Sequence, residues 1–398
     1  MSQENVERLR TALESLQGDS SARAWEGTLA GAWVELWDPE IEWDASTHPL
    51  PDLAGVYRGV EQTLGWWREW LAAWETVEAD YELVDAGDRV VGLFHQRMRG
   101  HYTGIDVASG RYGMVFTFRD GLIVHAQFHA RPYEALEAVG LRFVHAPDGV
   151  RIACEASGKG PPLVLVHGAG SARWSFDAVR PHLESRFTVI AIDRRGRGDS
   201  SDGDEYALER EFEDVAAVVR DAGEGALLMG HSYGGLVAAG AALLLDPPRL
   251  ALYEPVMGGA LSTAETIDRW ERLIAEGDRD AVLREFFRDI AGYEDEAIEE
   301  LARSPIWEAR RRIVPTLPRE LRAALEHRFD TAGMARLTMP VLLLVGTESP
   351  EWAVRSVAAY GEAMPASRTR SLDGQGHSAN MTAPDLLAAE LERFFTGA

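Results

Sequence analysis

Five short apolar runs, separated by helical segments, constrain the fold of this chain more than any other feature. These runs are Leu163–His167, Thr188–Ile192, Ala226–Met229, Leu250–Tyr253 and Val341–Val345. Continuous apolar runs of this length are typical of strands that are buried on both faces of a parallel sheet. The sequence therefore predicts a doubly wound α/β domain with a mostly parallel sheet in this part of the chain.

The first third of the chain follows a different pattern, in which apolar and polar residues alternate. Two such runs, 112–119 and 122–129, are separated by Asp120 and Gly121. An Asp-Gly pair between two alternating runs is a strong signal for a β-hairpin. We therefore expect a curved antiparallel sheet here.

Helical spacing comes before these strands. A first helix, ending at Gly18-Asp19, is predicted from apolar residues at helical spacing: Val6, Leu9, Leu13 and Leu16. A second helix is predicted from tryptophans four residues apart: Trp66, Trp70 and Trp74. Eight of the twelve tryptophans, beginning with Trp25, lie before residue 80, and their spacing predicts a role in the core. Helices followed by a sheet make this region an α+β domain.

The change of pattern gives the domain organisation. A chain of 398 residues is too long for one ordinary core, so two domains are expected. We place the boundary near Leu141, with domains at residues 1–141 and 142–398. Between the fourth and fifth apolar runs, about residues 256–337 are helical and charged and carry no strand signal. A helical insertion between two strands is suited to a lid.

Composition excludes several classes of function. The formal net charge of -24 argues against nucleic acid or an anionic membrane as partner. Lys159 is the single lysine and its spacing excludes a P-loop, while Cys154 as the single cysteine excludes disulfide frameworks and cysteine-rich metal sites. The polar, acidic start lacks the apolar core of a signal peptide, and no apolar run is long enough to span a membrane. We expect a cytoplasmic protein.

A candidate nucleophile follows the third apolar run. Residues 230–234 read Gly-His-Ser-Tyr-Gly, with the strand Ala226–Met229 before them and an apolar helix after them. A sharp strand-to-helix turn of this kind exposes a serine hydroxyl and needs glycines where other side chains would clash. The context makes Ser232 the candidate nucleophile, because the five-residue pattern alone is a weak signal.

Two further segments fit the same chemistry. His377 lies in the loop Gly374–Ser378, after a short strand and before the last helix, which makes it the candidate general base. The turn His167–Gly170 follows a buried strand, and its backbone N–H groups could bind a developing negative charge. We expect the oxyanion donors to be the amides of Ala169 and of Tyr233, the residue after the nucleophile.

The acid of the catalytic set is less clear, and two carboxylates compete. The usual position is the loop after Val341–Val345, where Ser349 occupies the expected place and Glu348 comes one residue early. A shift of one residue at a strand end can redirect a carboxylate. Glu254, directly after the strand Leu250–Tyr253, is the other candidate. We favour Glu254 and keep Glu348 as the alternative.

Together these segments resemble the α/β-hydrolase superfamily, from about Phe143 to Phe395. The resemblance implies Ser232 as nucleophile, His377 as base and no metal or organic cofactor. Some haloalkane dehalogenases of that superfamily keep their acid after the strand that here ends at Tyr253, which supports Glu254. The charged turn Asp193–Ser200 is also part of the resemblance, and we interpret it as a structured turn.

The first domain is similar to the SnoaL-like group of the NTF2-like superfamily. The matching stretches are 37–44, 55–59, 85–91 and 118–121. The resemblance implies a cone whose curved sheet and helices enclose an apolar pocket. The polar candidates for that pocket are Asp44, His48 and His95. His125 and His129 are about 13 Å apart along a strand, too far for one metal ion, and are expected to face solvent or a partner.

The leading hypothesis is therefore an esterase-like serine hydrolase that cleaves a small, fairly apolar ester, thioester or lactone through an acyl-enzyme. A second hypothesis makes the first domain a cyclase or isomerase that uses Asp44 and a histidine, with the hydrolase domain releasing the product. A third makes it a ligand-binding or homodimerisation module. The arginines Arg310–Arg312 of the lid are expected on a solvated helix face.

Overall fold

The computed structural model describes residues 2–14, 31–101, 103–108, 111–259 and 261–397. The predicted helix stop at Gly18-Asp19, Leu16 and Trp25 lie outside the described residues. The chain divides into two compact units, Met1–Arg142 and Phe143–Ala398. The division falls one residue after the Leu141 boundary expected from the change in hydrophobic pattern.

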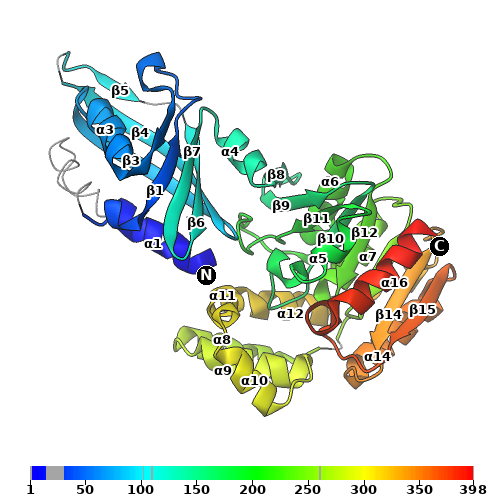
Figure 1. Cartoon of the computed structure of the whole chain (residues 1–398). Coiled ribbons are helices and arrows are strands. Elements are labelled where there is room, and N and C mark those ends of the chain that lie inside the picture. The colour runs from blue at the N-terminus through cyan, green and yellow to red at the C-terminus, as the bar shows by residue number, and fades with distance from the viewer. Residues whose placement is uncertain (1, 15–30, 102, 109–110, 260, 398) are drawn as a thin grey trace. The chain divides into compact units, whose positions relative to one another are not determined.

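The first unit combines a curved sheet with a few helices (Figure 1). Its strands are β1 (Trp37–Asp44), β2 (Val56–Arg58), β3 (Trp74–Ala86), β4 (Arg89–Gly100), β5 (Asp106–Ala108), β6 (Tyr112–Arg119) and β7 (Leu122–His129). Its helical elements are α1 (Ser2–Glu14), η1 (Val34–Leu36), η2 (Pro51–Leu53), α3 (Gly59–Leu71) and α4 (Pro132–Ala138). The strand order is β2-β1-β7-β6-β4-β3, and β5 pairs with β4.

The predicted hairpin is confirmed, whereas the predicted order of elements needs correction. Strands β6 and β7 pair antiparallel around Asp120 and Gly121, which have φ of 53° and 79°. However, β1 and β2 precede α3, and β1 pairs with β7 in parallel. Trp74 does not continue the tryptophan helix, because α3 ends at Leu71 and Trp74 begins β3.

Tryptophan forms much of the core of the first unit. Helix α3 presents Trp66, Trp67 and Trp70 toward the sheet, and all three are buried. They meet Trp43 of β1, whose ring centroid lies 5.3 Å from that of Trp66 and 5.4 Å from that of Trp67. Figure 1 shows the sheet curving around this helix. Bulky aromatic side chains therefore separate helix and sheet, and they determine the space that remains between them.

The second unit is built on an eight-stranded sheet of order β15-β14-β13-β12-β10-β11-β9-β8. Its strands are β8 (Leu141–His145), β9 (Arg151–Gly158), β10 (Pro162–Val166), β11 (Thr188–Ile192), β12 (Leu227–His231), β13 (Leu250–Tyr253), β14 (Val341–Gly346) and β15 (Ser367–Leu372). All pairs from β11 to β15 are parallel, and β9 pairs with β11 antiparallel. Each of the five predicted strands is present.

Helices cover both faces of this sheet (Figure 1). They are η3 (Arg173–Phe176), α5 (Arg180–Leu183), α6 (Leu208–Ala222), α7 (Tyr233–Ala242), α14 (Glu351–Ala363), α15 (Ala379–Thr382) and α16 (Pro384–Thr396). Alternate side chains of each central strand enter different cores. Val164 belongs to the core shared with α6, α7 and α14, whereas Leu165 belongs to the core shared with α5 and α16. Burial on both sides explains the uninterrupted apolar runs.

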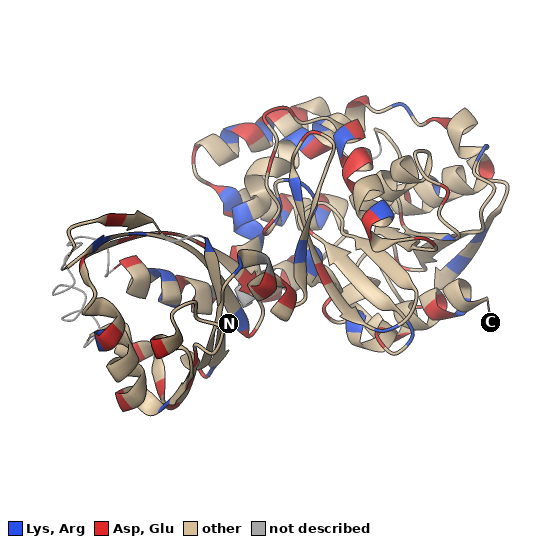
Figure 2. Ribbon diagram, turned by 90° about the horizontal axis from the view of Figure 1, so that it is seen from above, with Lys and Arg blue, Asp and Glu red and all other residues tan. Residues whose placement is uncertain are grey.

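A helical segment connects β13 to β14, as predicted. It contains α8 (Ala264–Ala275), α9 (Arg279–Glu285), η4 (Phe286–Ile290), α10 (Asp295–Ala302), α11 (Pro305–Ile313), η5 (Val314–Thr316), α12 (Leu317–Glu326) and α13 (Thr331–Met334). We call residues 256–337 the lid. Its charges, like those of the other helices, mix both signs, while the central strands carry almost none (Figure 2). None of the described helices has the length and apolar character needed to cross a membrane.

Candidate active site

Ser232 lies at the sharp turn between β12 and α7. Its backbone has φ of 57° and ψ of −124°, a conformation that non-glycine residues rarely adopt. Among the described residues, only Asp120, Ser232 and Glu254 combine a side chain with positive φ. Asp120 is in the hairpin turn, so the two remaining strained positions are Ser232 and Glu254. A strained backbone of this kind persists only where the surrounding structure holds it in place, and such residues are concentrated at functional sites.

Close packing around the turn explains its glycines. A Cβ on Gly230 would lie 2.3 Å from the carbonyl oxygen of Gly234. A Cβ on Gly234 would lie equally close, 2.3 Å, to the carbonyl oxygens of Val166 and His167. No side chain fits at these distances, so both glycines let β12 turn directly into α7 beside β10.

Three side chains from three loops form a continuous hydrogen-bonded chain. His377 Nε2 lies 2.9 Å from Ser232 Oγ, and His377 Nδ1 lies 2.5 Å from Glu254 Oε2. A carboxylate only accepts hydrogen bonds, so Nδ1 carries the proton and Nε2 accepts from the serine hydroxyl. This is the arrangement in which a histidine can remove the serine proton.

The surroundings of Glu254 keep it ionised. Burial raises the pKa of Glu254, but hydrogen bonds from His377, from the Gly346 N–H at 2.8 Å and from the Ser349 hydroxyl hold it below its ordinary value. Ser349, which sequence reasoning did not assign to the site, occupies the usual place of the acid and donates to the carboxylate that replaces it. The side chain of Glu348 is exposed, and its N–H bonds the Gln375 carbonyl.

Other buried groups hold the histidine loop in place. His231 donates from Nε2 to the carbonyl oxygen of His377 at 2.8 Å, and its ring stacks on Tyr253. The Tyr253 hydroxyl donates to the Gly376 carbonyl and accepts from the Ala379 N–H. Burial lowers the pKa of His231 to about 3, so this second histidine stays neutral. Trp352 packs edge-on against the His377 ring, 4.9 Å between centroids.

The turn after β10 lies directly against the serine. A Cβ on Gly168 would be 3.0 Å from the Cβ of Ser232, and Ala169 is the next residue. Tyr233 is the first residue of α7, so its N–H has no acceptor within the helix. These are the two amides expected to bind an oxyanion.

Arg194 holds this turn in place and connects the lid to it. Its backbone N–H donates to His167 Nε2, and its Nη2 donates to the Gly168 carbonyl. Its guanidinium also pairs with Glu211 of α6 and with Glu320 of the lid helix α12. The charged segment 193–200 is therefore a structured turn, as interpreted from the sequence, and its arginines are buried in an ion network.

The prediction for the lid arginines is wrong at Arg310. Arg310 is 5% exposed, whereas the side chains of Arg311 and Arg312 are 37% and 43% exposed. Its Nη1 donates to the Gly170 carbonyl at 2.5 Å, and the guanidinium lies over the rings of Trp174 and Phe287. Burial lowers the pKa of Arg310 to about 10, so it is still charged at neutral pH. Helical periodicity could not reveal which arginine faces inward.

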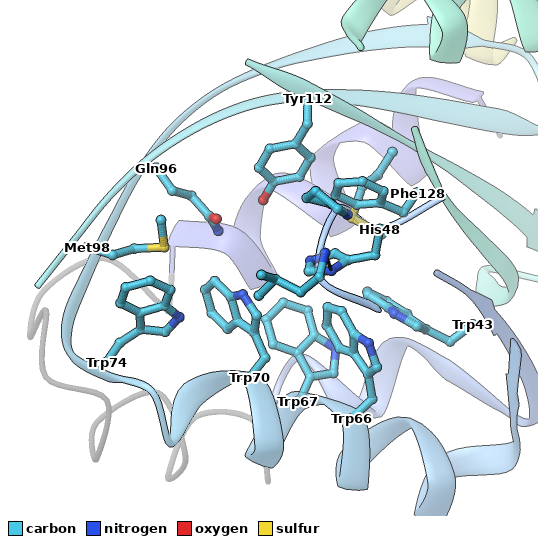
Figure 3. A pocket seen from close by; sticks show the side chains of 13 residues that line it. Trp43, His48, Trp66, Trp67, Trp70, Trp74, Gln96, Met98, Tyr112 and Phe128 are labelled. Atoms are coloured by element: carbon cyan, nitrogen blue, oxygen red, sulfur yellow. Dashed lines mark hydrogen bonds between the residues drawn. The ribbon is translucent and has the colours of Figure 1, made fainter. Parts of the chain in front are cut away.

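A second candidate site is a cavity of about 140 Å³ within the first unit. Figure 3 shows its wall of tryptophans on one side and side chains of β4, β6 and β7 on the other. The lining residues are Trp43, His48, Pro49, Leu50, Trp66, Trp67, Trp70, Trp74, Gln96, Met98, Tyr112, Met114 and Phe128. Burial lowers the pKa of His48, so its imidazole is neutral at pH 7. No carboxylate is among these residues.

Two of the three predicted pocket residues do not line this cavity. His48 does, but Asp44 and His95 are each one residue away from a lining residue, Trp43 and Gln96. Successive side chains of a strand point to opposite faces, so both point away from the cavity. Asp44 instead accepts hydrogen bonds from the Ser46 N–H and from Gln127. The expectation that Asp44 and His95 share a pocket with His48 is therefore corrected.

His125 and His129 are also absent from the cavity lining. Both lie on β7, where Phe128 is the residue that faces the cavity. His125 is near Glu42 of β1, with 3.7 Å between Nε2 and the carboxylate. Their side chains therefore contribute nothing to the cavity.

Comparison with known proteins agrees with these two units. The model of the Alpha/beta hydrolase family matches residues 163–390, and that of the SnoaL-like domain matches residues 20–126. A solved alpha/beta hydrolase from Sphaerobacter thermophilus DSM 20745 is 35% identical, with a TM-score of 0.58, and covers 64% of this chain and 100% of that chain.

Two curated relatives match different lengths of chain. The pimeloyl-(acyl-carrier protein) methyl ester esterase of Aeromonas hydrophila is 27% identical over 61% of this chain and 98% of that protein. The probable oxidoreductase EphD of Mycobacterium tuberculosis is 37% identical over 100 residues, which are 23% of this chain and 17% of that protein. Since the first family model covers more than half of the chain, the protein belongs to the alpha/beta hydrolase family, with a SnoaL-like domain before the hydrolase domain.

Proposed function

We propose that the second unit is a serine hydrolase that cleaves a small ester, thioester or lactone through an acyl-enzyme on Ser232. The observation that carries the proposal is the chain from Ser232 through His377 to Glu254, with spacings of 2.9 and 2.5 Å. The esterase name of the Aeromonas relative, and membership of the hydrolase family, support an ester-type substrate.

The reaction would proceed in two steps. Ser232 Oγ attacks the carbonyl carbon while His377 Nε2 takes the hydroxyl proton, and the amides of Ala169 and Tyr233 bind the resulting oxyanion. His377 returns the proton to the leaving alcohol or thiol. In the second step His377 takes a proton from water, the hydroxide attacks the acyl-enzyme, and the acid leaves as Ser232 recovers its proton. Glu254 stabilises the imidazolium in both steps. Ser232, His377 and Glu254 would carry out these proton transfers without a cofactor.

Rapid-mixing kinetics test this two-step scheme. With an activated ester such as para-nitrophenyl butyrate, we expect a burst of nitrophenolate of about one equivalent per chain before steady turnover, because acylation outpaces deacylation. Burst amplitude should scale with protein concentration. Hydrolysis without a burst, combined with failure to trap an acyl group on the protein, would contradict the acyl-enzyme.

For the first unit, the cavity favours ligand binding over catalysis. Its lining offers aromatic faces with His48, Gln96 and Tyr112 as polar groups, and Asp44, the acid required by the cyclase hypothesis, points away from it. An apolar cavity of about 150 Å³ holds a molecule the size of benzene, close to the 140 Å³ found here. The first unit would therefore bind a small, uncharged, planar molecule.

Calorimetric titration with indole tests this binding role. Wild-type protein is expected to bind indole, and Met98→Trp should abolish the binding, because the larger side chain fills the cavity. His95→Ala is the matched control, since His95 is on the same strand and is not in the lining. Equal binding by Met98→Trp and wild type, or no binding by wild type, would refute the assignment.

A further inference from the structure

Arg310 differs from the other buried arginines of the described chain. Buried arginines are Arg173, Arg180, Arg194, Arg195, Arg197 and Arg310. The first five each pair with at least one carboxylate. Within the described residues no carboxylate lies within ion-pair distance of Arg310, and burial lowers its pKa.

An uncompensated buried charge is costly, and proteins rarely retain one without a partner. The contacts of Arg310 compensate only part of the cost. Nη1 donates a hydrogen bond to the Gly170 carbonyl, and the rings of Trp174 and Phe287 attract the guanidinium cation. Nε has no acceptor in the described structure, and Nη2 faces the sulfur of Met381 at 3.7 Å, a weak acceptor. One edge of the guanidinium fork, Nε with Nη2, therefore lacks an oxygen.

The position of this edge connects it with the active site. Gly170 belongs to the turn whose Gly168 lies against Ser232, and Met381 comes four residues after His377. The guanidinium thus lies between the segments that carry the oxyanion amide and the base. Ser232 and His377 are 5% and 7% exposed, as buried as Arg310 at 5%. Lid side chains also cover this turn, since Arg310 donates to the Gly170 carbonyl and Phe286 packs beside Gly170.

Building on the proposed hydrolase function, we propose that Arg310 binds a carboxylate of the substrate, so that the natural substrate is an acidic ester, thioester or lactone. The planar fork of arginine matches a carboxylate through two parallel hydrogen bonds. Met381 is unbranched and flexible, so its side chain can leave Nη2 when the carboxylate arrives. An acidic substrate differs from the fairly apolar one expected from the sequence, which stays a prediction.

Paired substrates test the inference. In the first pair, mono-para-nitrophenyl glutarate carries the carboxylate on the acyl side and para-nitrophenyl valerate is its neutral counterpart. In the second pair, para-butyryloxybenzoate carries it on the alcohol side and phenyl butyrate is neutral. We expect a preference for the acidic member in one pair, and that pair identifies the side that faces Arg310. Arg310→Gln should reduce this preference by about 10- to 100-fold, the effect of losing a charged hydrogen bond, mainly through KM.

Two controls separate recognition from lid anchoring. Arg312→Gln removes a neighbouring exposed arginine of the same helix and should keep the wild-type preference. Arg310→Lys keeps the charge without the fork and should restore part of it. If Arg310→Gln slows both members of each pair equally, Arg310 only anchors the lid. The inference also fails if the wild-type protein shows no preference for the acidic ester over its neutral counterpart in either pair.

Binding without turnover separates this inference from the proposed function. Calorimetry on Ser232→Ala with the preferred acidic ester should give binding that is about 10- to 100-fold tighter than with its neutral counterpart. Ser232→Ala/Arg310→Gln should lose that difference. Charge-selective binding by a protein whose wild type hydrolyses no ester would refute the hydrolase proposal alone. Hydrolysis without charge-selective binding would refute the role of Arg310 alone.

Discussion

Replacement of Ser232 by alanine is expected to lower kcat for ester hydrolysis by about a millionfold, because removal of the nucleophile from a serine triad disables the remaining members as well. The hydroxyl removed is the one that lies 2.9 Å from His377 Nε2. The small side chain of alanine fits the same turn, so the fold should persist. Steady-state kinetics on para-nitrophenyl butyrate, with circular dichroism to check folding, measures the effect.

Ser371→Ala provides the matched control for this loss. Ser371 is exposed on β15, and its removal leaves the catalytic chain untouched. We expect wild-type turnover from it. If folded Ser232→Ala retained a rate near that of wild type, another residue would have to be the nucleophile.

The second large effect is expected at Glu254. Glu254→Gln should lower kcat by about 10⁴, as the corresponding Asp-to-Asn change does in a serine protease. An amide at this position can donate to Nδ1 of His377, which favours the tautomer whose Nε2 carries the proton and cannot accept from Ser232. The Gly346 N–H would still have an oxygen to bond. The measurement is kcat at neutral pH, where the lowered pKa keeps wild-type Glu254 ionised.

Glu348→Gln discriminates between the two candidate acids. The exposed side chain of Glu348 leads us to expect a rate close to that of wild type. A large loss in Glu348→Gln together with a small loss in Glu254→Gln would reverse the assignment. A small loss in both would remove the acid from the mechanism.

The sheet of the second unit could be predicted because its strands are buried on both faces. The run Thr188–Ile192 then has only apolar residues after its first position, Thr188, and the predicted bounds are those of β11. The turn at Ser232 was predictable for a related reason, since packing against Val166 and His167 requires glycine at fixed positions. Burial on both faces and the need for glycine at the turn each restrict which residues can stand at neighbouring positions, so both can be predicted from a short stretch of sequence.

The buried arginines and the first-unit pocket were not predictable in the same way. Arg194 pairs with Glu320, 126 residues away in the chain, and nothing near either residue indicates the pairing. The sequence predicts a solvated face for Arg310 because it is the first of three consecutive arginines. Asp44 and His95 are each one position away from a residue that lines the cavity. On a strand, a shift of one position reverses the direction of the side chain. Such features depend on tertiary packing.

Labelling with a fluorophosphonate probe, located by peptide mass spectrometry, tests the central claim most directly. The probe reacts with a serine only where a base activates it and an oxyanion site accepts the phosphonyl oxygen. We predict one adduct per wild-type chain, on the peptide that contains Ser232, and none on Ser232→Ala. Folded wild-type protein that remains unlabelled, or an adduct that persists in Ser232→Ala, would contradict the assignment of Ser232 as the nucleophile.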